Sequence, residues 1–504
     1  MTFKPAFDAQ GKRVIETDER GTGMIHDPLL NKGTAFTEKE RKDFGLEGLL
    51  PSHISTLGEQ LMRVKKNYDN KSNDIEKYIF LRALQDRNEV LFYALLRNHI
   101  SEMLPIVYTP TVGEAVQRHG QIYRVARGLF ITPENVDNMD EMAASLPTRN
   151  IRIIVATDGQ GILGIGDQGA GGMAISIGKL SLYSVGAGIH PSLTLPICLD
   201  VGTDNMALLG DPLYLGSKRR RITGDDYSIF IKKFADGVKR NFPDAVLQWE
   251  DFSKSNAFNN LDGYRKEMVS FNDDIQGTGA VVLGGIFGAM KIKGQRLKEQ
   301  KIAIFGAGAA GIGIARQLLG GMIGEGLSRQ DALDSIFIVD SAGLLVAGRQ
   351  AGIDDYKKDF AKPKGVVSGW PQAKEGNWML EETIKHSGVT VLIGVSGRVN
   401  LMMQNSAEPV IFPLSNPTAK AEADPRWILE YTKGTAIVSS GSPFDPVTVQ
   451  GREYRIGQGN NAFIFPGLGL GLLAASTKEV TDSLFTAAAD ALAQAMPESD
   501  IKSR

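Results

Sequence analysis

One segment constrains the fold more than any other, because it reads as a strand, a glycine-rich turn and a helix in succession. It is KIAIFGAGAAGIGIARQLL, residues 301–319, and its turn fits the pattern G-x-G-x-x-G. Such glycines permit a tight bend, close approach of backbone to a pyrophosphate and close helix–strand packing, while the helix N-terminus favours the negative charge. A turn without a ligand is the alternative, but the strand before it and the helix after it indicate a dinucleotide site. The residues expected to contact the cofactor are Gly306, Gly308, Ala309, Ala310 and Gly311.

The next predicted strand, IFIVD (336–340), ends at an acidic residue. A carboxylate at the position of Asp340 binds the ribose hydroxyls and favours NAD. It lies more than the usual roughly 20 residues beyond the turn, and the insertion GEGLSRQDALD accounts for the difference. Ser341 follows directly and Lys357-Lys358 lie downstream, where they either neutralise the 2′-phosphate of NADP or form a solvated helix face. The expected cofactor is NAD, with NADP left open.

The chain is too long, at 504 residues, for one compact core, so two or three domains are expected. Residues 1–130 are expected to form a helical N-terminal region. Strands alternate with helices over residues 131–275, which predicts an α/β domain to which 461–504 return. Residues 276–460 form the predicted Rossmann-type dinucleotide-binding domain. The predicted fold class is therefore α/β, with a Rossmann-type domain, a second α/β domain and a helical N-terminal region.

Within the N-terminal region, one long stretch carries the helical pattern. DIEKYIFLRALQDRNEVLFYALLRNHISEML (74–104) has apolar residues at helical spacing, and Pro105 is expected to break it. The following IVYTPTVG places Tyr108 in a turn between two prolines.

The charge balance argues against a nucleic-acid partner. Lys and Arg total 56 and Asp and Glu total 58, so the formal charge is -2 and no general basic field exists. The one dense basic run, Lys218–Arg221, is expected to be a solvated loop, with a phosphate or allosteric-anion contact as the alternative.

Neither the apolar runs nor the N-terminus predicts a membrane or export signal. No apolar run is long enough to span a bilayer, and MTFKPAFDAQGKRV lacks the apolar core of a signal peptide, so a cytoplasmic location is expected. The single cysteine, Cys198 in LTLPICLD, is expected to be a buried thiol. One cysteine forms no internal disulfide, which fits a reducing compartment.

Two acidic pairs stand at the ends of apolar or aromatic runs, Glu250-Asp251 and Asp273-Asp274. A set of oxygen ligands without Cys and with little His suits a hard cation, Mg²⁺ or Mn²⁺. Taken singly, each pair is more often a helix cap or a solvated turn. Only the fold can bring the two pairs together.

A candidate base and a candidate acid complete the pattern. Lys179 lies in the glycine-containing, otherwise apolar ISIGKLSLY, where desolvation beside a metal would lower its pKa and let it act as a base. Tyr108 could donate a proton. From the local sequence alone, a structural role is favoured for both residues.

Several motifs, read together, resemble those of the malic enzyme family, and more closely the large-subunit type found in bacteria and mitochondria. They occur in order between about residue 26 and about residue 490, and FNDDIQGTGAV is very specific. The motifs are YTPTVG (108–113), TDGQGILGIGDQG (157–169), IGKLSLY (177–183), WEDF (249–252), FNDDIQGTGAV (271–281), GAGAAGIGIA (306–315), PLSNPT (413–418) and NNAFIFPG (460–467).

This resemblance implies the oxidative decarboxylation of L-malate to pyruvate and CO₂, using NAD or NADP and Mn²⁺ or Mg²⁺. It makes 131–275 the malate- and metal-binding catalytic domain, and it implies a homodimer or homotetramer. Carried over motif by motif, it implies that Glu250, Asp251 and Asp274 bind the metal and that Asp273 is the carboxylate that orients the site. It implies Lys179 as the general base and Tyr108 as the general acid. Asn416 and Asn461 are implied to contact substrate and nicotinamide.

The sequence departs from the family pattern at one position. The family loop T-D-G-E-R-I-L-G reads TDGQGILG here, so Gly161 replaces an Arg that holds the malate carboxylate. Another cation, such as Arg127, would have to substitute. Glycine at this position is familiar from the related malolactic enzymes, which convert L-malate to L-lactate and CO₂ with NAD retained.

Three readings of the function therefore remain. The motifs YTPTVG, GDQG and GSPFDP favour the oxidative malic enzyme over the malolactic enzyme. A third reading is a non-catalytic, dinucleotide-binding regulatory protein with a decayed site. Intact Tyr108, Lys179 and metal-binding carboxylates argue against it.

Overall fold

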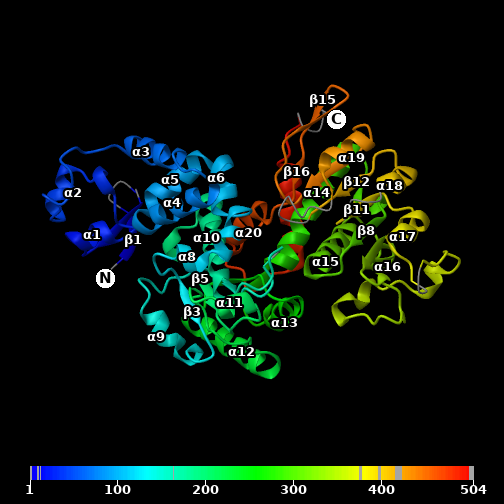
Figure 1. The fold of residues 1–504 in the computed structure, drawn as a ribbon, viewed down its shortest axis with the longest axis horizontal. Coiled ribbons are helices and arrows are strands. Elements are labelled where there is room, and N and C mark those ends of the chain that lie inside the picture. The colour runs from blue at the N-terminus through cyan, green and yellow to red at the C-terminus, as the bar shows by residue number, and fades with distance from the viewer. Residues whose placement is uncertain are drawn as a thin grey trace. The chain divides into compact units, whose positions relative to one another are not determined.

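The computed structural model divides the chain into two compact units, Met1–Leu247 and Gln248–Arg504. The structure describes residues 3–7, 11, 13–162, 164–373, 377–394, 399–414 and 423–498. Each unit is described by itself below, with the element labels of Figure 1.

The first unit opens with an antiparallel strand pair, which is followed by a run of short helices. The pair is β1 (Phe3–Phe7) with β2 (Arg13–Thr17). Helices α2 and α3 both begin at a threonine whose hydroxyl accepts a hydrogen bond from the third backbone N–H of the helix, so both have a capping box. The helices before the next strand are α1 (Thr22–His26), α2 (Glu38–Asp43), α3 (Leu57–Asp69), α4 (Asp74–Arg87), α5 (Glu89–Asn98), α6 (Ile100–Val107), α7 (Thr111–Gln117) and α8 (His119–Ile122).

The stretch 74–104, where apolar spacing predicted helical structure, forms three helices, α4, α5 and α6. Asn88 ends α4 and begins α5, because its side chain accepts a hydrogen bond from the Leu91 N–H. His99 separates α5 from α6. The prediction that Pro105 breaks the helix was wrong, since Pro105 lies inside α6. The asparagine side chain hydrogen-bonds to backbone groups in place of helical hydrogen bonds. The spacing of apolar residues does not reveal this effect.

Parallel strands form the sheet of the first unit, in the order β3 (Leu129–Ile131), β5 (Thr194–Leu199), β4 (Ile153–Thr157). Strand β6 (Val246–Glu250) begins beside β4, where the Val246 N–H donates to the Arg152 carbonyl oxygen. Every residue of β4 is buried, as expected for a parallel strand covered on both faces. Helix α10 packs on β4 and β5. The helices here are α9 (Met139–Ala144), α10 (Met173–Ala187), α11 (Met206–Gly210) and α12 (Gly224–Asn241).

The second unit holds a seven-stranded sheet in the order β10-β9-β8-β11-β12-β13-β16. The pairs are parallel except β9 with β10. The strand order reverses at β8, which lies between β9 and β11, and ligands of such sheets bind at this switch point. The predicted Rossmann-type α/β fold is thereby confirmed. The strands are β8 (Ile302–Phe305), β9 (Ile336–Asp340), β10 (Gly343–Leu344), β11 (Val391–Ile393), β12 (Val410–Phe412), β13 (Ile437–Ser440) and β16 (Gly457–Gln458).

Outside this sheet the second unit has a short strand β7 (Ser270–Asn272), next to β6, and an antiparallel pair, β14 (Val447–Val449) with β15 (Arg452–Tyr454). Figure 1 shows α15, α17, α18 and α19 around strands β8, β11 and β12. The helices are α13 (Lys254–Tyr264), α14 (Thr278–Lys293), α15 (Ala309–Gly324), α16 (Arg329–Asp334), α17 (Leu380–Ser387), α18 (Val399–Asn405), α19 (Pro425–Tyr431), α20 (Phe465–Ala474) and α21 (Asp482–Gln494).

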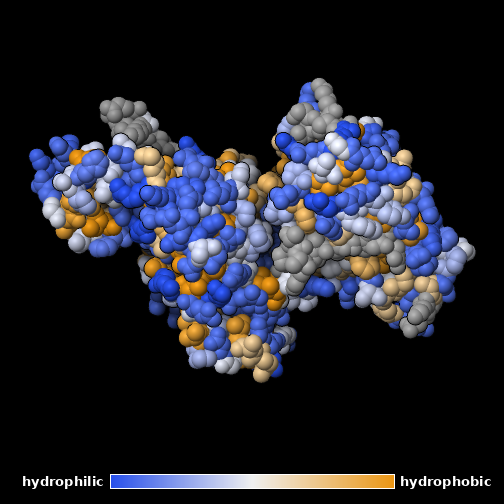
Figure 2. Space-filling view, turned by 45° about the horizontal axis from the view of Figure 1, so that its top comes forward, coloured by the Kyte–Doolittle hydropathy of each residue, from blue (hydrophilic) through white to orange (hydrophobic). Residues whose placement is uncertain are grey.

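One helix, Asp273–Lys293, is long and apolar enough to cross a membrane by length and composition, and within the described residues it is the only one. Its most apolar window is 72% buried inside the protein, and α14 within it packs against α15 and α21. A helix that is apolar all round and covered by other helices is a core helix. On the face seen in Figure 2, hydrophobic residues form small, separate patches in a mainly hydrophilic surface.

Candidate active site

The structure brings three carboxylates of the second unit together. One carboxylate oxygen from each of Glu250, Asp251 and Asp274 lies within 4.8 Å of the other two. Glu250 ends β6 and Asp251 follows it, while Asp274 lies in a π-helical turn, Asp273–Gly277, directly after β7. Because β6 and β7 are neighbouring strands, residues at their ends reach the same place.

The backbone at Asp251 adopts a conformation that non-glycine residues rarely take, with a φ of 55°. Its N–H donates to Asp274 Oδ2 over 2.7 Å, which ties the two acidic pairs to each other. Gln248 Nε2 donates to Glu250 Oε2 over 2.9 Å and fixes the third carboxylate. Backbone strain of about 1–3 kcal/mol is typical at functional sites, where the surrounding structure maintains it.

The chemistry of this donor set fits a divalent cation. Glu250 and Asp251 are only 2% and 5% exposed, so their charges are largely removed from water. Three carboxylates this close repel one another, and burying them without a counter-charge is costly. Oxygen-only ligands are those preferred by Mg²⁺ and Mn²⁺, which complete their shells with water or substrate oxygens.

Asp273 lies next to this cluster and is fully buried. Asn461 Nδ2 donates to the Asp273 carbonyl oxygen over 3.1 Å and to its Oδ2 over 3.0 Å. A Cβ on Gly277 would lie 1.9 Å from Asp273 Oδ1, so a larger residue there would displace the Asp273 carboxylate. The structure thus places Asn461 against Asp273, and the predicted contact of Asn461 to substrate or nicotinamide remains a prediction.

The predicted dinucleotide turn lies between β8 and α15, at the switch point of the sheet. Gly306 has a φ of 118°, which favours glycine. A Cβ on Gly311 would lie 1.8 Å from the Gly306 carbonyl oxygen, so this glycine permits the close turn–helix packing that the motif predicts. Helix α15 begins at Ala309, which leaves its first N–H groups available to an anion.

One further glycine links this helix to the carboxylates, and sequence reasoning missed it. A Cβ on Gly313 would lie only 2.0 Å from the carbonyl oxygen of Ile275, in the π-helical turn that carries Asp274. Helix α15 and this turn are therefore in backbone contact. The signal was the fourth glycine of GAGAAGIG, two positions beyond the last glycine of the standard pattern.

Asp340 ends β9 as predicted, and a residue that the sequence analysis did not identify holds it. Arg349 Nη1 donates to Asp340 Oδ1 over 2.9 Å and Nη2 to Oδ2 over 2.5 Å. Burial alone would raise the pKa of Asp340, but the hydrogen bonds and charge of Arg349 lower it below the ordinary value. The carboxylate is therefore ionised and fixed in direction. The only signal was an isolated arginine in VAGRQAG.

The lysines considered for a 2′-phosphate are both ion-paired. Lys357 Nζ lies 2.6 Å from Asp354 Oδ2, and Lys358 Nζ lies 2.5 Å from Asp355 Oδ1. The side chain of Lys358 is 65% exposed, whereas that of Lys357 is 13% exposed. Their segment is a 3-10 turn, Asp355–Phe360, so the predicted charged helix face is a short charged turn.

In the first unit, the structure brings the candidate acid and base together. Lys179 lies on α10 and is 1% exposed, and its Nζ is 5.8 Å from the centre of the Tyr108 ring. Tyr108 ends α6. Gly178 makes this approach possible, since a Cβ there would lie 3.1 Å from the Val107 carbonyl oxygen and 3.4 Å from the Tyr108 ring. The local sequence favoured a structural role for each residue separately and gave no sign of the pairing.

The loop that carries Gly161 is built on a buried ion-pair network. Arg221 donates from Nε to Asp167 Oδ2 over 2.8 Å and from Nη2 to Oδ1 over 2.7 Å. It also donates to the Asp158 carbonyl oxygen over 2.8 Å, and Tyr227 donates to Asp158 Oδ2 over 2.9 Å. Burial raises the pKa of Asp158, while Arg221 opposes that shift. Arg221 thus holds the loop together.

The prediction that the basic run is a solvated loop is confirmed for Lys218 and Arg220, which are exposed in a loop, and is wrong for Arg221. Arg221 is buried, and Arg219 and Arg220 pair with Glu134 and Asp204. A run of like charges gives no indication of distant acidic partners.

Arg127, the candidate for a replacement cation, is engaged elsewhere in the first unit. It pairs with Glu89 over 2.6 Å and with Asp86 over 3.3 Å. Asn416 lies outside the residues that the structure describes, so its predicted contact to substrate or nicotinamide remains a prediction.

Comparison with protein families assigns both parts of the chain. Residues 85–265 match the family model "Malic enzyme, N-terminal domain", and residues 275–504 match "Malic enzyme, NAD binding domain". The chain is 48% identical to the NAD-dependent malic enzyme of Edwardsiella ictaluri, in an alignment that covers 97% of this chain and 87% of that protein. It is also 48% identical to the NAD-dependent malic enzyme of Pseudomonas savastanoi pv. phaseolicola, in an alignment that covers 95% of this chain and 86% of that protein. The chain belongs to the malic enzyme family.

Solved structures agree on the fold. The crystal structure of Entamoeba histolytica malic enzyme matches with a TM-score of 0.51 and 21% identity, covering 89% of this chain and 79% of that one. At this identity the match supports the fold alone.

Proposed function

We propose that this chain catalyses the oxidative decarboxylation of L-malate to pyruvate and CO₂, reduces NAD and depends on Mg²⁺ or Mn²⁺. One observation carries the proposal: the turn with Asp274 and the helix that follows the dinucleotide turn are packed backbone to backbone at Gly313 and Ile275. Cation and nucleotide are thereby assigned to one rigid piece of the second unit. The similar proteins named NAD-dependent malic enzyme support this reaction.

Glu250, Asp251 and Asp274 would hold the cation. When bound, it would supply Lewis-acid polarisation of the oxygen on C2 of malate, as well as a counter-charge for a substrate carboxylate. The nucleotide would lie against Gly306–Gly311, with its ribose hydroxyls at Asp340, and would accept the hydride from C2. Asp273, held by Asn461, would keep the turn of Asp274 in place.

The pair in the first unit would move the protons. Lys179 is assigned as the base that takes the proton of the C2 hydroxyl, since it is buried on α10 with its Nζ 5.8 Å from the centre of the Tyr108 ring. Loss of CO₂ from the resulting β-keto acid leaves the enolate of pyruvate. Tyr108 is assigned as the acid that protonates this enolate at C3. Asn416 is assigned as a contact to substrate or nicotinamide.

Gly161 supports a second candidate, the malolactic reaction to L-lactate and CO₂ with NAD retained. Two arginines that could replace the family Arg, Arg127 and Arg221, are committed to carboxylates. Incubation with L-malate, NAD and Mn²⁺ separates the candidates, with absorbance of reduced cofactor and lactate measured together. Reduced cofactor and pyruvate in equal amounts are expected. Lactate without net reduced cofactor would overturn the oxidative proposal.

A parallel incubation with NADP tests the cofactor choice. The ionised Asp340, fixed by Arg349, would repel a 2′-phosphate, so a higher kcat/KM with NAD is expected. Cofactor binding without turnover of malate would favour the non-catalytic regulatory reading. A cytoplasmic homodimer or homotetramer is also proposed, and sedimentation velocity would test the assembly.

A further inference from the structure

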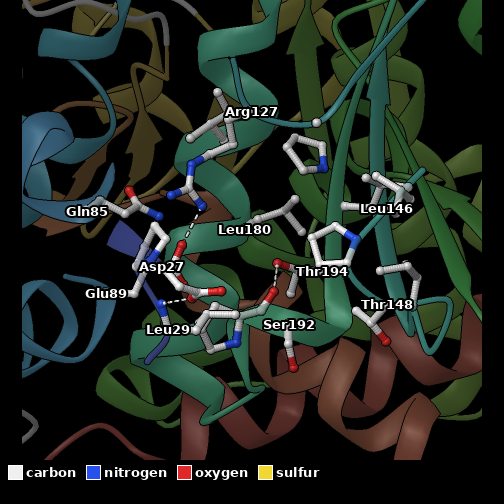
Figure 3. Close-up of a pocket in the computed structure, with 18 of the residues that line it drawn as sticks. Asp27, Leu29, Gln85, Glu89, Arg127, Leu146, Thr148, Leu180, Ser192 and Thr194 are labelled. Atoms are coloured by element: carbon white, nitrogen blue, oxygen red, sulfur yellow. Dashed lines mark hydrogen bonds and ion pairs between the residues drawn. The ribbon is translucent and has the colours of Figure 1, made fainter. Parts of the chain in front are cut away.

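The first unit contains a cavity of about 240 Å³ that the proposed reaction does not use. Figure 3 shows Gln85, Glu89 and Arg127 on one side of it, with Leu146 and Thr148 on the other. Its remaining walls are mainly apolar. They include Leu29, Ile151, Ile177, Leu180 and Leu195.

The arginine in this wall is already neutralised. Arg127 Nη1 donates to Glu89 Oε1 over 2.6 Å, and its Nη2 and Nε donate to Asp86 Oδ1 over 3.3 and 3.4 Å. Glu89 also contributes to raising the pKa of Tyr93 to about 12, an effect due mainly to burial, so the phenol stays protonated. An anionic ligand would therefore meet an arginine shared by two carboxylates and would gain little from it.

The carboxylate in the wall has unused hydrogen-bonding capacity. Glu89 is 4% exposed, and its Oε2 is buried without a hydrogen-bond partner among the described residues. A buried carboxylate oxygen that receives no hydrogen bond is costly, so the site favours a ligand that supplies an N–H or O–H donor.

The charges around the cavity also favour a cation. Asp27, Asp86 and Glu89 bring three negative charges, and Arg127 brings one positive charge. Arg82 is the second cation nearby, and its Nη1 donates to Gln85. The local balance remains negative by one charge when both arginines are counted.

We infer that this cavity binds a small amphipathic amine, with its ammonium group at Glu89 and its apolar body against the leucine and isoleucine wall. A charge-assisted hydrogen bond to the carboxylate and burial of a hydrocarbon body are the two interactions that the walls offer. Helix α10 forms one wall through Ile177 and Leu180, which flank Lys179 in the sequence. The inference concerns binding alone and does not depend on the proposed reaction.

Isothermal titration calorimetry with 2-phenylethylamine tests the inference on the full chain, without malate, cofactor or metal. Two matched probes carry another group in place of the ammonium group. 2-Phenylethanol carries a neutral hydroxyl, and 3-phenylpropanoate carries a carboxylate. For a ligand of this size, affinity in the roughly millimolar to micromolar range is expected. The amine should bind about ten-fold more tightly than the alcohol, since its hydrogen bond is charge-assisted. The carboxylate should give no binding heat.

Two variants locate the site. Leu146→Trp places a larger side chain in the cavity from the wall opposite Glu89 and Arg127, and it should abolish binding of amine and alcohol alike. Glu89→Gln should remove the preference for the amine and leave the alcohol unchanged. If Glu89→Gln does not fold, the comparison of the three probes on the wild-type chain still decides the chemistry. Tighter binding of the carboxylate, or amine binding unchanged in Leu146→Trp, would overturn the inference.

Discussion

Two buried lysines show how the same side chain serves different ends in this chain. Lys179 and Lys362 are 1% and 2% exposed. Lys179 lies over the ring of Tyr108, on the helix that the motif IGKLSLY forms. Lys362 lies over the ring of Phe337 at 4.2 Å and donates to the Leu333 carbonyl oxygen over 2.5 Å. Only the first belongs to a family motif, so the sequence could identify it and not the second.

Replacing Lys179 tests its role as a base. Lys179→Met is expected to lower kcat by about 10²–10⁴-fold, the usual contribution of general acid–base catalysis. Lys179→Arg keeps the positive charge but cannot release a proton near neutral pH, so it should be equally inactive. Steady-state kcat of both variants, measured from pH 6 to pH 9, checks this. Near-normal turnover by Lys179→Arg would show that only the charge matters.

Lys362 is expected to make stability depend on pH. Burial lowers the pKa of Lys362 from 10.5 to about 8, so between these values the unfolded chain holds more protons than the folded one. The free energy of unfolding should therefore rise with pH through this window and be reduced below pH 8. Lys362→Met removes the charge and should stabilise the fold by about 1–2 kcal/mol at pH 7, after the lost hydrogen bond is offset.

Thermal unfolding of wild type and Lys362→Met at pH 7 and pH 10 measures the effect. The difference in melting temperature should shrink as pH rises, because wild type loses its penalty. A difference that is constant with pH would contradict the assignment, and unchanged activity of the variant serves as the control.

At the scale of elements, glycines set the distances on which the site depends. Gly178 lets α10 approach the end of α6, and Gly313 lets α15 approach the turn of Asp274. The sequence predicted the turn–helix element because its glycine spacing is local. It could not predict which distant backbone each additional glycine would meet, since that depends on packing.

Gly178→Ala is expected to separate catalysis from stability. Its Cβ would lie 3.1 Å from the Val107 carbonyl oxygen, so α6 or α10 must shift by a few tenths of an ångström. Small displacements of positioned groups are costly in rate, and a fall in kcat of about ten-fold or more is expected. Gly113→Ala, on the adjacent helix α7, is the matched control, because an added Cβ there would have no neighbouring atom within 4 Å.

The control variant should keep its kcat and gain about 0.5–1 kcal/mol from helix propensity. Turnover and denaturant unfolding of both variants provide the measurements. Equal kcat values for the two would show that the spacing of Tyr108 and Lys179 does not matter.

At the scale of the molecule, local motifs predicted the α/β class and the carboxylates, but not the arginines that hold carboxylates in place. The pattern of strands and the G-x-G-x-x-G turn specify a Rossmann-type sheet through short-range rules. Arg349 and Arg221 act on carboxylates 9 and 54 residues away, through contacts that no periodicity records. Apolar spacing also did not predict the helix boundaries at Asn88 and His99. Side-chain hydrogen bonds to the backbone compete with helical hydrogen bonds, and the spacing of apolar residues does not reveal them.

The division into two units provides a direct test of the metal site. All four tryptophans, at 249, 370, 378 and 427, lie in the second unit with the carboxylate cluster, so tryptophan emission reports on that unit alone. Mg²⁺ at about 100 times its dissociation constant should stabilise that unit by about 2.7 kcal/mol. This corresponds to a rise in melting temperature of about 5–10 °C.

Removal of Mg²⁺ with a chelator should return the melting temperature to its starting value. Asp274→Asn should abolish the shift, because it removes one carboxylate charge from the cluster and leaves a single side-chain oxygen at the position that also accepts from the Asp251 N–H. Asp262→Asn, an exposed carboxylate on α13, should keep the shift in full. A shift of equal size in Asp274→Asn would place the cation elsewhere, because this variant lacks one of the three carboxylates that form the cluster.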